Sequence, residues 1–284
     1  MEIPTIVKWA GGKKQLLEQF KPLYPKKFNN YYEPFIGSGA VFFYLRKIDL
    51  HRKMMYPDEG REYFLSDNNR NLINLYVDVR DKLDELISLL ETYKKKHHKD
   101  DDYYYQVRDD FNKGSKGIER SAQFIYLNKT CFNGLYRVNS KGGFNVPKGE
   151  YNNPAILNKQ ALGEASRLLQ GVKIKCLSFE ETEPLPQKED FVYLDPPYHP
   201  LSETASFTSY TKEDFTIKDQ ERLAEYYKKL DDRGCFVMLS NSDTDFIKSL
   251  YKGYEIKTAK ARRAISCKGQ GRGKINEIIV RNYS

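Results

Sequence analysis

The residues with the clearest capacity for chemistry are Asp195, Pro196, Pro197 and Tyr198, which directly follow the apolar run Phe191–Leu194. The apolar run predicts a buried strand, and ligands of open α/β sheets bind at the carboxyl ends of strands. Prolines lack an N–H, so this turn offers rigid carbonyl acceptors beside a carboxylate and an aromatic ring. Such a set suits the exocyclic amine of a planar base. The alternative is a proline-rich turn in which Asp195 only caps the backbone.

A glycine turn, Gly37-Ser38-Gly39, follows an earlier short strand and opens a helix. Glycines permit a sharp turn and the close approach of a ligand to the free N–H groups of the helix. The third glycine of a dinucleotide fingerprint is missing, since Val41 takes the nearest place, which disfavours a pyrophosphate cofactor. Asp67 ends the next strand, where an acid binds ribose hydroxyls, although it could instead be a helix N-cap. A nucleoside without pyrophosphate fits S-adenosylmethionine better than NAD.

Apolar runs alternate with helical patterns along the chain, which predicts an α/β fold with a doubly wound sheet. Strands are expected at 30–34, 63–66, 172–177, 191–194, 235–240, 254–257 and 277–281, the last two as an antiparallel hairpin that closes the sheet. Helices are expected at 13–20, 40–47, 69–79, 82–96, 118–128, 158–169 and 217–230. The alternation breaks after residue 80. We therefore expect a catalytic domain of residues 1–80 and 165–284 and an inserted, mainly helical domain of residues 81–164.

Composition limits the class of protein further. The 284 residues carry a net charge of +8, which favours a polyanionic partner such as nucleic acid. The four cysteines form no C-x-x-C pair, so neither a zinc site nor a disulfide framework is expected. No segment is apolar enough to span a bilayer and the N-terminus has no signal-peptide pattern. We expect a monomeric cytoplasmic protein.

Several segments, in order, resemble the Dam-type N6-adenine DNA methyltransferases, a match that spans essentially the whole chain. They are Lys8–Lys13, Glu33–Gly39, Asn128–Arg137, Gly143–Pro147 and Asp195–Tyr198. The resemblance extends to the methylase of DpnII-type restriction and modification pairs, which implies GATC duplexes as substrate and a cognate endonuclease without a stable complex. It also implies a Rossmann-like fold with a seven-stranded mixed sheet and a recognition domain between the glycine motif and D-P-P-Y.

The resemblance implies a pocket for S-adenosylmethionine. Its residues would be Trp9, Lys13, Pro34, Phe35, Gly37, Gly39, Asp67, Phe179 and Asp195. Phe179 would pack on the cofactor adenine. Core packing is the alternative role for Trp9 and Phe179, and an exposed charge is the alternative for Lys13.

The resemblance also implies a direct in-line transfer to a flipped adenine, without a metal or a covalent intermediate. The Asp195 carboxylate and the Pro196 carbonyl would accept hydrogen bonds from N6, and Tyr198 would stack on the base. Related motifs methylate cytosine N4, RNA bases or protein glutamine, so another planar amine stays open as a substrate. A non-catalytic DNA-binding module is the alternative from a different class.

Base recognition is expected within the inserted segment, aided by Lys8 at the outer base pair. The residues implied are Lys8, Phe132, Asn133, Leu135, Arg137 and Pro147. Arg137 could form a bidentate contact with guanine, or else clamp a phosphate. Phe132 would wedge into the vacated stack. Phosphate contacts are expected from a basic loop between the last two strands, at Arg262, Arg263, Lys268, Arg272 and Lys274, and the loop 199–212 would order over the base.

Overall fold

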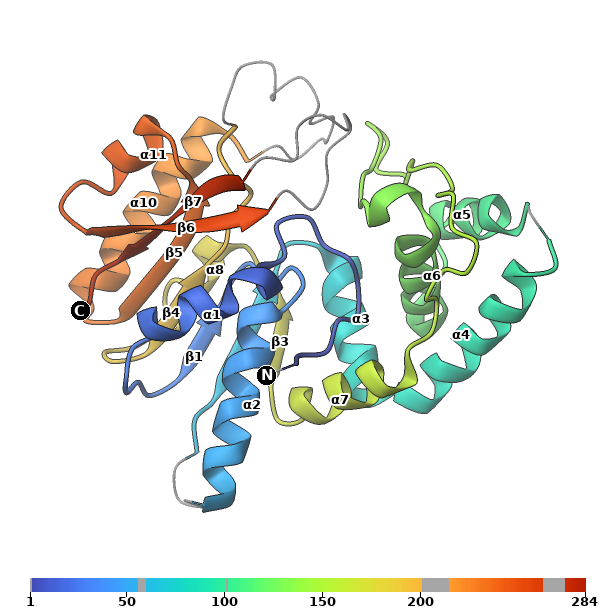
Figure 1. The fold of residues 1–284 in the computed structure, drawn as a ribbon, viewed down its shortest axis with the longest axis horizontal. Coiled ribbons are helices and arrows are strands. Elements are labelled where there is room, and N and C mark those ends of the chain that lie inside the picture. The colour runs from blue at the N-terminus through green and yellow to red at the C-terminus, as the bar shows by residue number, and fades with distance from the viewer. Residues whose placement is uncertain (1, 56–59, 101, 201–214, 263–273) are drawn as a thin grey trace.

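The computed structural model describes residues 2–55, 60–100, 102–200, 215–262 and 274–284. Its centre is a seven-stranded sheet with the order β3-β2-β1-β4-β5-β7-β6 (Figure 1). The strands are β1 (Tyr31–Glu33), β2 (Tyr63–Asp67), β3 (Lys173–Cys176), β4 (Phe191–Leu194), β5 (Phe236–Ser242), β6 (Glu255–Arg262) and β7 (Lys274–Arg281). The pairs among β1 to β5 are parallel, whereas β7 is antiparallel to both β5 and β6. The predicted strands and the closing hairpin are confirmed.

Strand β4 shows why the sheet has a core on both faces. Its four residues are all buried, as expected for a central parallel strand covered by helices on each side. Because side chains alternate along a strand, Phe191 and Tyr193 join one hydrophobic cluster while Val192 and Leu194 join the other. The apolar run that precedes the D-P-P-Y turn therefore anchors that turn in the middle of the molecule.

The helices agree with the expected ones at most positions. They are α1 (Leu17–Phe20), α2 (Ala40–Met55), α3 (Arg70–Asp81), α4 (Leu83–His97), α5 (Tyr103–Lys113), α6 (Gly117–Thr130), α7 (Lys159–Leu169), α8 (Phe179–Thr182), α10 (Ile217–Asp232) and α11 (Asp245–Leu250), with 3-10 turns η1 (Lys13–Leu16), η2 (Lys21–Leu23) and η3 (Phe132–Gly134). The helix expected at 13–20 is a 3-10 turn followed by α1. Helices α5, α8 and α11 were not predicted. Two of them are one- or two-turn helices, too short to show an apolar period.

Helices α4, α5 and α6 stand apart from the sheet, with α3 and α7 between (Figure 1). Hydrogen bonds join the two parts: the Ser121 hydroxyl donates to Asp78 over 2.6 Å, and Arg120 Nε donates to Asn71 over 2.6 Å. One hydrophobic cluster runs from the sheet into α4, α5 and α6. The division into domains at residues 81 and 164 stays a prediction.

The strand order places a ligand crevice beside the two motifs. From β1 the chain proceeds outward to β2 and β3, whereas β4 and β5 lie on the other side of β1. Ligands of such sheets bind at this switch point, outside the carboxyl ends of the strands. The glycine turn follows β1 and the D-P-P-Y turn follows β4.

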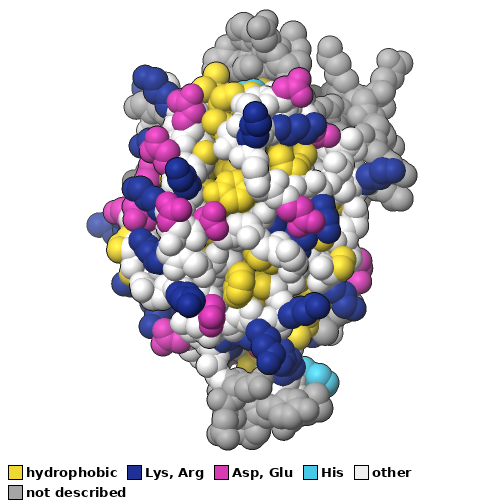
Figure 2. Space-filling view, turned by 90° about the vertical axis from the view of Figure 1, so that its left-hand side faces the viewer, with side chains coloured by type: hydrophobic (Ala, Val, Ile, Leu, Met, Phe, Trp, Pro, Cys, Tyr) yellow, Lys and Arg dark blue, Asp and Glu magenta, His cyan; other side chains and the backbone are white. Residues whose placement is uncertain are grey.

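The face at the left of Figure 1 mixes acidic and basic side chains without a field of one sign (Figure 2). No helix among the described residues is long and apolar enough to cross a membrane.

Candidate active site

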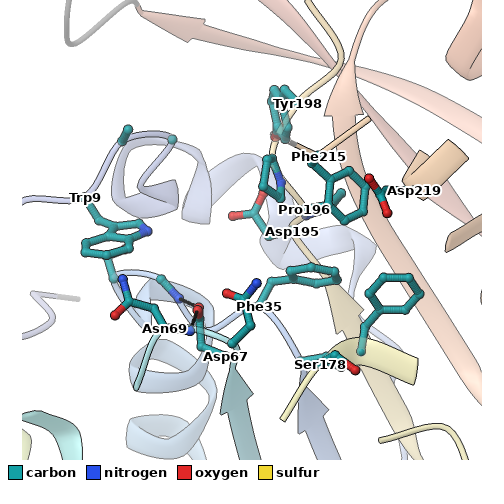
Figure 3. Close-up of a pocket in the computed structure, with 18 of the residues that line it drawn as sticks. Trp9, Phe35, Asp67, Asn69, Ser178, Asp195, Pro196, Tyr198, Phe215 and Asp219 are labelled. Atoms are coloured by element: carbon teal, nitrogen blue, oxygen red, sulfur yellow. Dashed lines mark hydrogen bonds between the residues drawn. The ribbon is translucent and has the colours of Figure 1, made fainter. Parts of the chain in front are cut away.

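A cavity of about 810 Å³ opens at the carboxyl ends of β1, β2 and β4 (Figure 3). It brings together most residues expected at the cofactor and target sites, although they come from segments far apart in the sequence. Those lining it are Trp9, Lys13, Pro34, Phe35, Gly37, Asp67, Leu135, Phe179, Asp195, Pro196 and Tyr198. Gly39 is expected in the pocket but packs behind it, where an added Cβ would lie 2.9 Å from the Tyr76 hydroxyl.

Asp195 is held by an ion pair inside this cavity. Its Oδ1 lies 2.7 Å from the Nζ atom of Lys13, whose side chain is 3% exposed. Burial raises the pKa of Asp195 from 3.8 to about 6, although the Lys13 ammonium opposes this shift. Among the described residues no backbone N–H donates to the Asp195 carboxylate, so its alternative role as a backbone cap is not seen. Lys13 is not an exposed charge.

A second carboxylate, that of Glu277 on β7, completes this cluster. Its Oε2 accepts a hydrogen bond from the Tyr198 hydroxyl over 2.7 Å and lies 4.0 Å from the Lys13 ammonium. The ammonium also lies 4.8 Å from the centre of the Tyr198 ring. Sequence reasoning missed Glu277, because only the antiparallel pairing of β7 with β5 brings it beside the D-P-P-Y turn.

The glycine turn is shaped by Trp9. Gly37 has a φ of +47°, and a Cβ at this position would lie 2.9 Å from Cδ1 of Trp9. The Trp9 ring stacks on Tyr136, with ring centres 5.7 Å apart, and also contacts Phe124. Only glycine allows this close approach together with a left-handed backbone. Trp9 therefore both lines the cavity and packs against the core, while its contact with the cofactor stays a prediction.

Asp67 binds backbone amides at the edge of the cavity. Its carboxylate accepts hydrogen bonds from the N–H of Asn69, over 2.9 Å, and of Gly37, over 3.3 Å. Burial raises its pKa from 3.8 to about 6. The N-cap of α3 is Asn69, whose side chain accepts from the N–H groups of Asn71 and Leu72. The alternative role of Asp67 as helix cap is therefore not seen.

The far end of the cavity is aromatic. Phe35 and Phe179 stack with ring centres 5.6 Å apart, and Phe215 meets the Phe35 ring edge-on at 6.0 Å. Phe179 is 5% exposed and belongs to the core cluster, so it lines the cavity from within the core. Asp219 and Arg222, at the start of α10, also line this end. Sequence reasoning missed Phe215 and both charged residues. The capping box of Thr216 and Asp219 is visible in the sequence, but it indicates only where the helix begins and not that the helix start lines a cavity.

The segment expected to read bases is an irregular loop after α6. Within it, Arg137 Nε donates to the Asn145 side chain over 2.8 Å, which fixes the guanidinium. Phe132 is 44% exposed, and its N–H donates to the carbonyl of Pro147 over 2.9 Å. Leu135 lies at the cavity wall. The loop that carries these expected base-reading residues therefore also contributes Leu135 and Tyr136 to the wall of the cavity.

The N-terminal motif runs beside this loop. Lys8 and Asn128 exchange two hydrogen bonds, of 2.7 and 2.8 Å, between the backbone of Lys8 and the side chain of Asn128. The Lys8 ammonium lies 4.4 Å from the centre of the Tyr151 ring. A smaller cavity of about 400 Å³ is lined by Lys8, Asn133 and Tyr151, among others. Lys8 and Asn133 are therefore neighbours, as expected for residues that act on one ligand.

The basic loop expected to bind phosphates is only partly described. Arg262 and Lys274 were expected in the loop but form the last pair of the β6–β7 ladder. The apolar residues predicted strands at 254–257 and 277–281, whereas the paired strands extend to Arg262 and from Lys274. Backbone hydrogen bonds form the ladder, so it can extend beyond the apolar residues. Arg263, Lys268 and Arg272 lie outside the described residues, and so does most of the segment 199–212.

Comparison with known proteins agrees with this geometry. Residues 9–265 match the family described as D12 class N6 adenine-specific DNA methyltransferase. The chain belongs to this family. It is therefore a DNA adenine methyltransferase.

Curated relatives match this methyltransferase over nearly its full length. The Type II methyltransferase M.MjaIII of Methanocaldococcus jannaschii is 46% identical, with 100% of both chains covered. The Type II methyltransferase M1.LlaDCHI of Lactococcus lactis subsp. cremoris is 43% identical, covering 100% of this chain and 96% of the relative. The DNA adenine methylase of Escherichia coli K12 is 36% identical, with 97% and 94% covered.

Proposed function

We propose that this methyltransferase transfers a methyl group from S-adenosylmethionine to N6 of adenine in double-stranded GATC. The observation that carries the proposal is the corner formed by the Asp195 carboxylate and the Pro196 carbonyl at the cavity wall. Both groups accept hydrogen bonds and neither donates, which matches the two N–H bonds of an exocyclic amine. No described residue donates to the Pro196 carbonyl.

The residues of the cavity fit S-adenosylmethionine. Phe35 and Phe179 offer apolar faces to an adenine ring, and the Asp67 carboxylate can accept from ribose hydroxyls beside Gly37. The volume of about 810 Å³ is in the upper part of the range for small-molecule sites, about 300–1,000 Å³. It leaves room for a nucleoside and a target base together. When bound, the cofactor supplies an electrophilic methyl group on a sulfonium.

Asp195 would act on the amine rather than on the methyl group. The lone pair of adenine N6 is delocalised into the ring, and hydrogen bonds to Asp195 and Pro196 favour a more tetrahedral nitrogen. The carboxylate also places negative charge where positive charge develops on N6. Lys13 would keep Asp195 ionised, since its ammonium lowers the pKa of that carboxyl against the effect of burial. Much of the acceleration would come from holding N6 and the methyl carbon in line.

The adenine must leave the duplex to reach this corner. Unpairing a base costs a few kcal/mol, which stacking and backbone contacts offset. Tyr198, held by Glu277, would stack on the flipped base. Phe132 is 44% exposed beside the expected reading residues, which supports its role as the side chain that fills the vacated stack.

The specificity for GATC rests on the segments Asn128–Arg137 and Gly143–Pro147, through their resemblance to the reading segment of Dam-type enzymes. Two of the relatives are named Type II methyltransferases, which supports a role in protecting host DNA from a cognate endonuclease. A third relative is named DNA adenine methylase, a name that does not include the term Type II.

Methyl transfer to defined duplexes tests the proposal. Tritiated S-adenosylmethionine is supplied with a GATC duplex and with four duplexes that each change one base pair of the site, and the products are digested to nucleosides. We expect N6-methyladenine, made from the GATC duplex about tenfold or more faster than from the others, the scale of one wrong base pair in a recognition site. Equal rates on all duplexes would refute the GATC assignment, and N4-methylcytosine alone would refute the target base.

A further inference from the structure

Two buried amides bind the D-P-P-Y turn from neighbouring elements. Gln220 lies in the first turns of α10 and Asn241 near the end of β5, and both are 0% exposed. Strand β4 ends at Leu194, so no backbone ladder fixes the residues that follow. Buried amides cost free energy unless they are hydrogen-bonded. Their partners therefore indicate what these side chains do.

The hydrogen bonds of these two side chains form one connected series that begins and ends at the backbone of the turn. Gln220 Nε2 donates to the carbonyl of Pro197 over 2.9 Å. Asn241 Nδ2 donates to Gln220 Oε1 over 2.9 Å. Asn241 Oδ1 accepts from the N–H of His199 over 3.3 Å. The two ends of this hydrogen-bond series thus bind the backbone of Pro197 and of His199, on either side of Tyr198.

The orientation of both amides is settled by their backbone partners. The N–H of Ser242 donates to Asn241 Oδ1 over 2.8 Å, and an N–H can only donate. The Asn241 amide nitrogen must therefore face Gln220 Oε1. It follows that the Gln220 nitrogen faces Pro197, whose carbonyl is thereby occupied. Pro196 lines the cavity, and its carbonyl, unlike that of Pro197, has no donor among the described residues.

We propose that Gln220 and Asn241 are positioning residues for methyl transfer. By holding Pro197 and His199, they present the Asp195 carboxylate and the Pro196 carbonyl to the target amine. This inference rests on the proposed role of Asp195 and Pro196. Neither amide lines the cavity, so each acts only through the turn.

Asn282 provides a matched control, because it bridges the other ends of β5 and α10. Asn282 accepts from the N–H of Val237 on β5 over 2.8 Å and donates to Asp231 on α10 over 2.7 Å. It joins β5 to α10 as Gln220 and Asn241 do, but it does not touch the turn. A variant at Asn282 therefore removes an amide bridge of the same kind without moving Pro196.

The test compares Gln220→Glu, Gln220→Met and Asn241→Leu with Asn282→Ala, each in the full-length enzyme. Gln220→Glu keeps the size of the side chain but places an acceptor against the Pro197 carbonyl. Single-turnover methyl transfer at saturating DNA and cofactor, the dissociation constant for S-adenosylmethionine and the melting temperature are measured for each. We expect the Gln220 and Asn241 variants to lose about 10- to 100-fold in rate, the scale for small misplacement of a reacting group. Cofactor affinity should fall much less than the rate, because Phe35, Asp67 and Phe179 lie on other elements of the cavity wall and do not move with the turn.

Asn282→Ala should lower the melting temperature but keep the rate. If a folded Gln220→Glu or Gln220→Met variant keeps the rate of the Asn282→Ala enzyme, the inference is wrong. An equal loss of rate in all variants would make these amides structural. The Asp195→Ala variant, measured in the same experiment, separates a failure of the proposed catalytic role from a failure of the positioning role. If it retains turnover, the proposed catalytic role fails. If it loses turnover while the Gln220 variants do not, only the positioning role fails.

Discussion

Lys13 and Glu277 shift the pKa of Asp195 in opposite directions, so the ionisation of this carboxyl can be tested with a variant of each. Its carboxylate must be ionised to accept from the amine, and burial raises its pKa to about 6. The single-turnover rate should therefore fall about tenfold per unit as the pH drops below about 6. Lys13 lowers this pKa and Glu277 raises it. Lys13→Gln should move the acid limb of the rate profile to higher pH, and Glu277→Gln should move it to lower pH.

The cofactor concentration must be saturating in that measurement, because the pKa of Asp67 is also raised to about 6 and cofactor binding would titrate in the same range. A rate that is flat from pH 5 to pH 8, or limbs that move in the same direction in both variants, would contradict the role given to Asp195.

Asp67 is expected to bind the ribose of the cofactor. Asp67→Ala should weaken the binding of S-adenosylmethionine by about 1.5 to 3 kcal/mol, the scale of lost hydrogen bonds to a charged group. Isothermal titration calorimetry measures this directly. Asn158→Ala is a suitable control, because it removes the N-cap of α7, outside the cavity, and should leave the affinity unchanged. An unchanged dissociation constant in a folded Asp67→Ala protein would exclude the ribose contact.

Arg137 is expected to read a guanine. Arg137→Ala should cost about 1 to 3 kcal/mol of affinity on the GATC duplex and much less on a duplex altered at that base pair. Lys274→Ala, if Lys274 neutralises a phosphate, should weaken all duplexes alike and reduce the salt slope by about one unit. Binding titrations at several salt concentrations measure both. A uniform loss on mutating Arg137, with specificity intact, would make it a backbone clamp.

At the scale of elements, the turn after β1 makes a sharp prediction. Gly37→Ala places a Cβ 2.9 Å from Trp9 at a φ of +47°, so the variant must both strain the backbone and displace the ring. The backbone alone costs about 1 to 2 kcal/mol. Gly163→Ala, in α7 with nothing within 4 Å, should instead gain about 0.5 to 1 kcal/mol. Chemical denaturation compares the two. A Gly37→Ala protein as stable as Gly163→Ala would contradict the account of this turn.

The elements also show what a sequence can and cannot predict. The run Phe191–Leu194 predicted its strand because a strand buried on both faces is apolar at every position. Helix α8 was missed although its capping box, Ser178 with Glu181, is visible in the sequence. Glu277, Gln220 and Asn241 could not be predicted as neighbours of the D-P-P-Y turn. They reach it only through strand order and helix packing, which no local pattern encodes.

At the scale of the whole molecule, the cavity and the reading loop share one framework. Trp9, from the N-terminal motif, stacks on Tyr136, which belongs to the loop after α6 that is expected to read bases. The same ring packs on the glycine turn. The hydroxyl of Tyr136 accepts from Asn71 of α3 over 3.2 Å. The loop that would contact DNA is thus anchored on the wall of the catalytic cavity. The net charge of +8 favours association with DNA that weakens as salt rises.

We expect the Asp195–Pro196 corner to act on the target amine. The most direct test is the single-turnover rate of methyl transfer to a GATC duplex by Asp195→Asn and Asp195→Ala, with folding and the affinity for both ligands measured in parallel. We expect Asp195→Ala to abolish transfer, and Asp195→Asn to retain slight activity because its amide oxygen still accepts a hydrogen bond. Transfer by Asp195→Ala at the wild-type rate would exclude a role for this carboxylate in activating the amine.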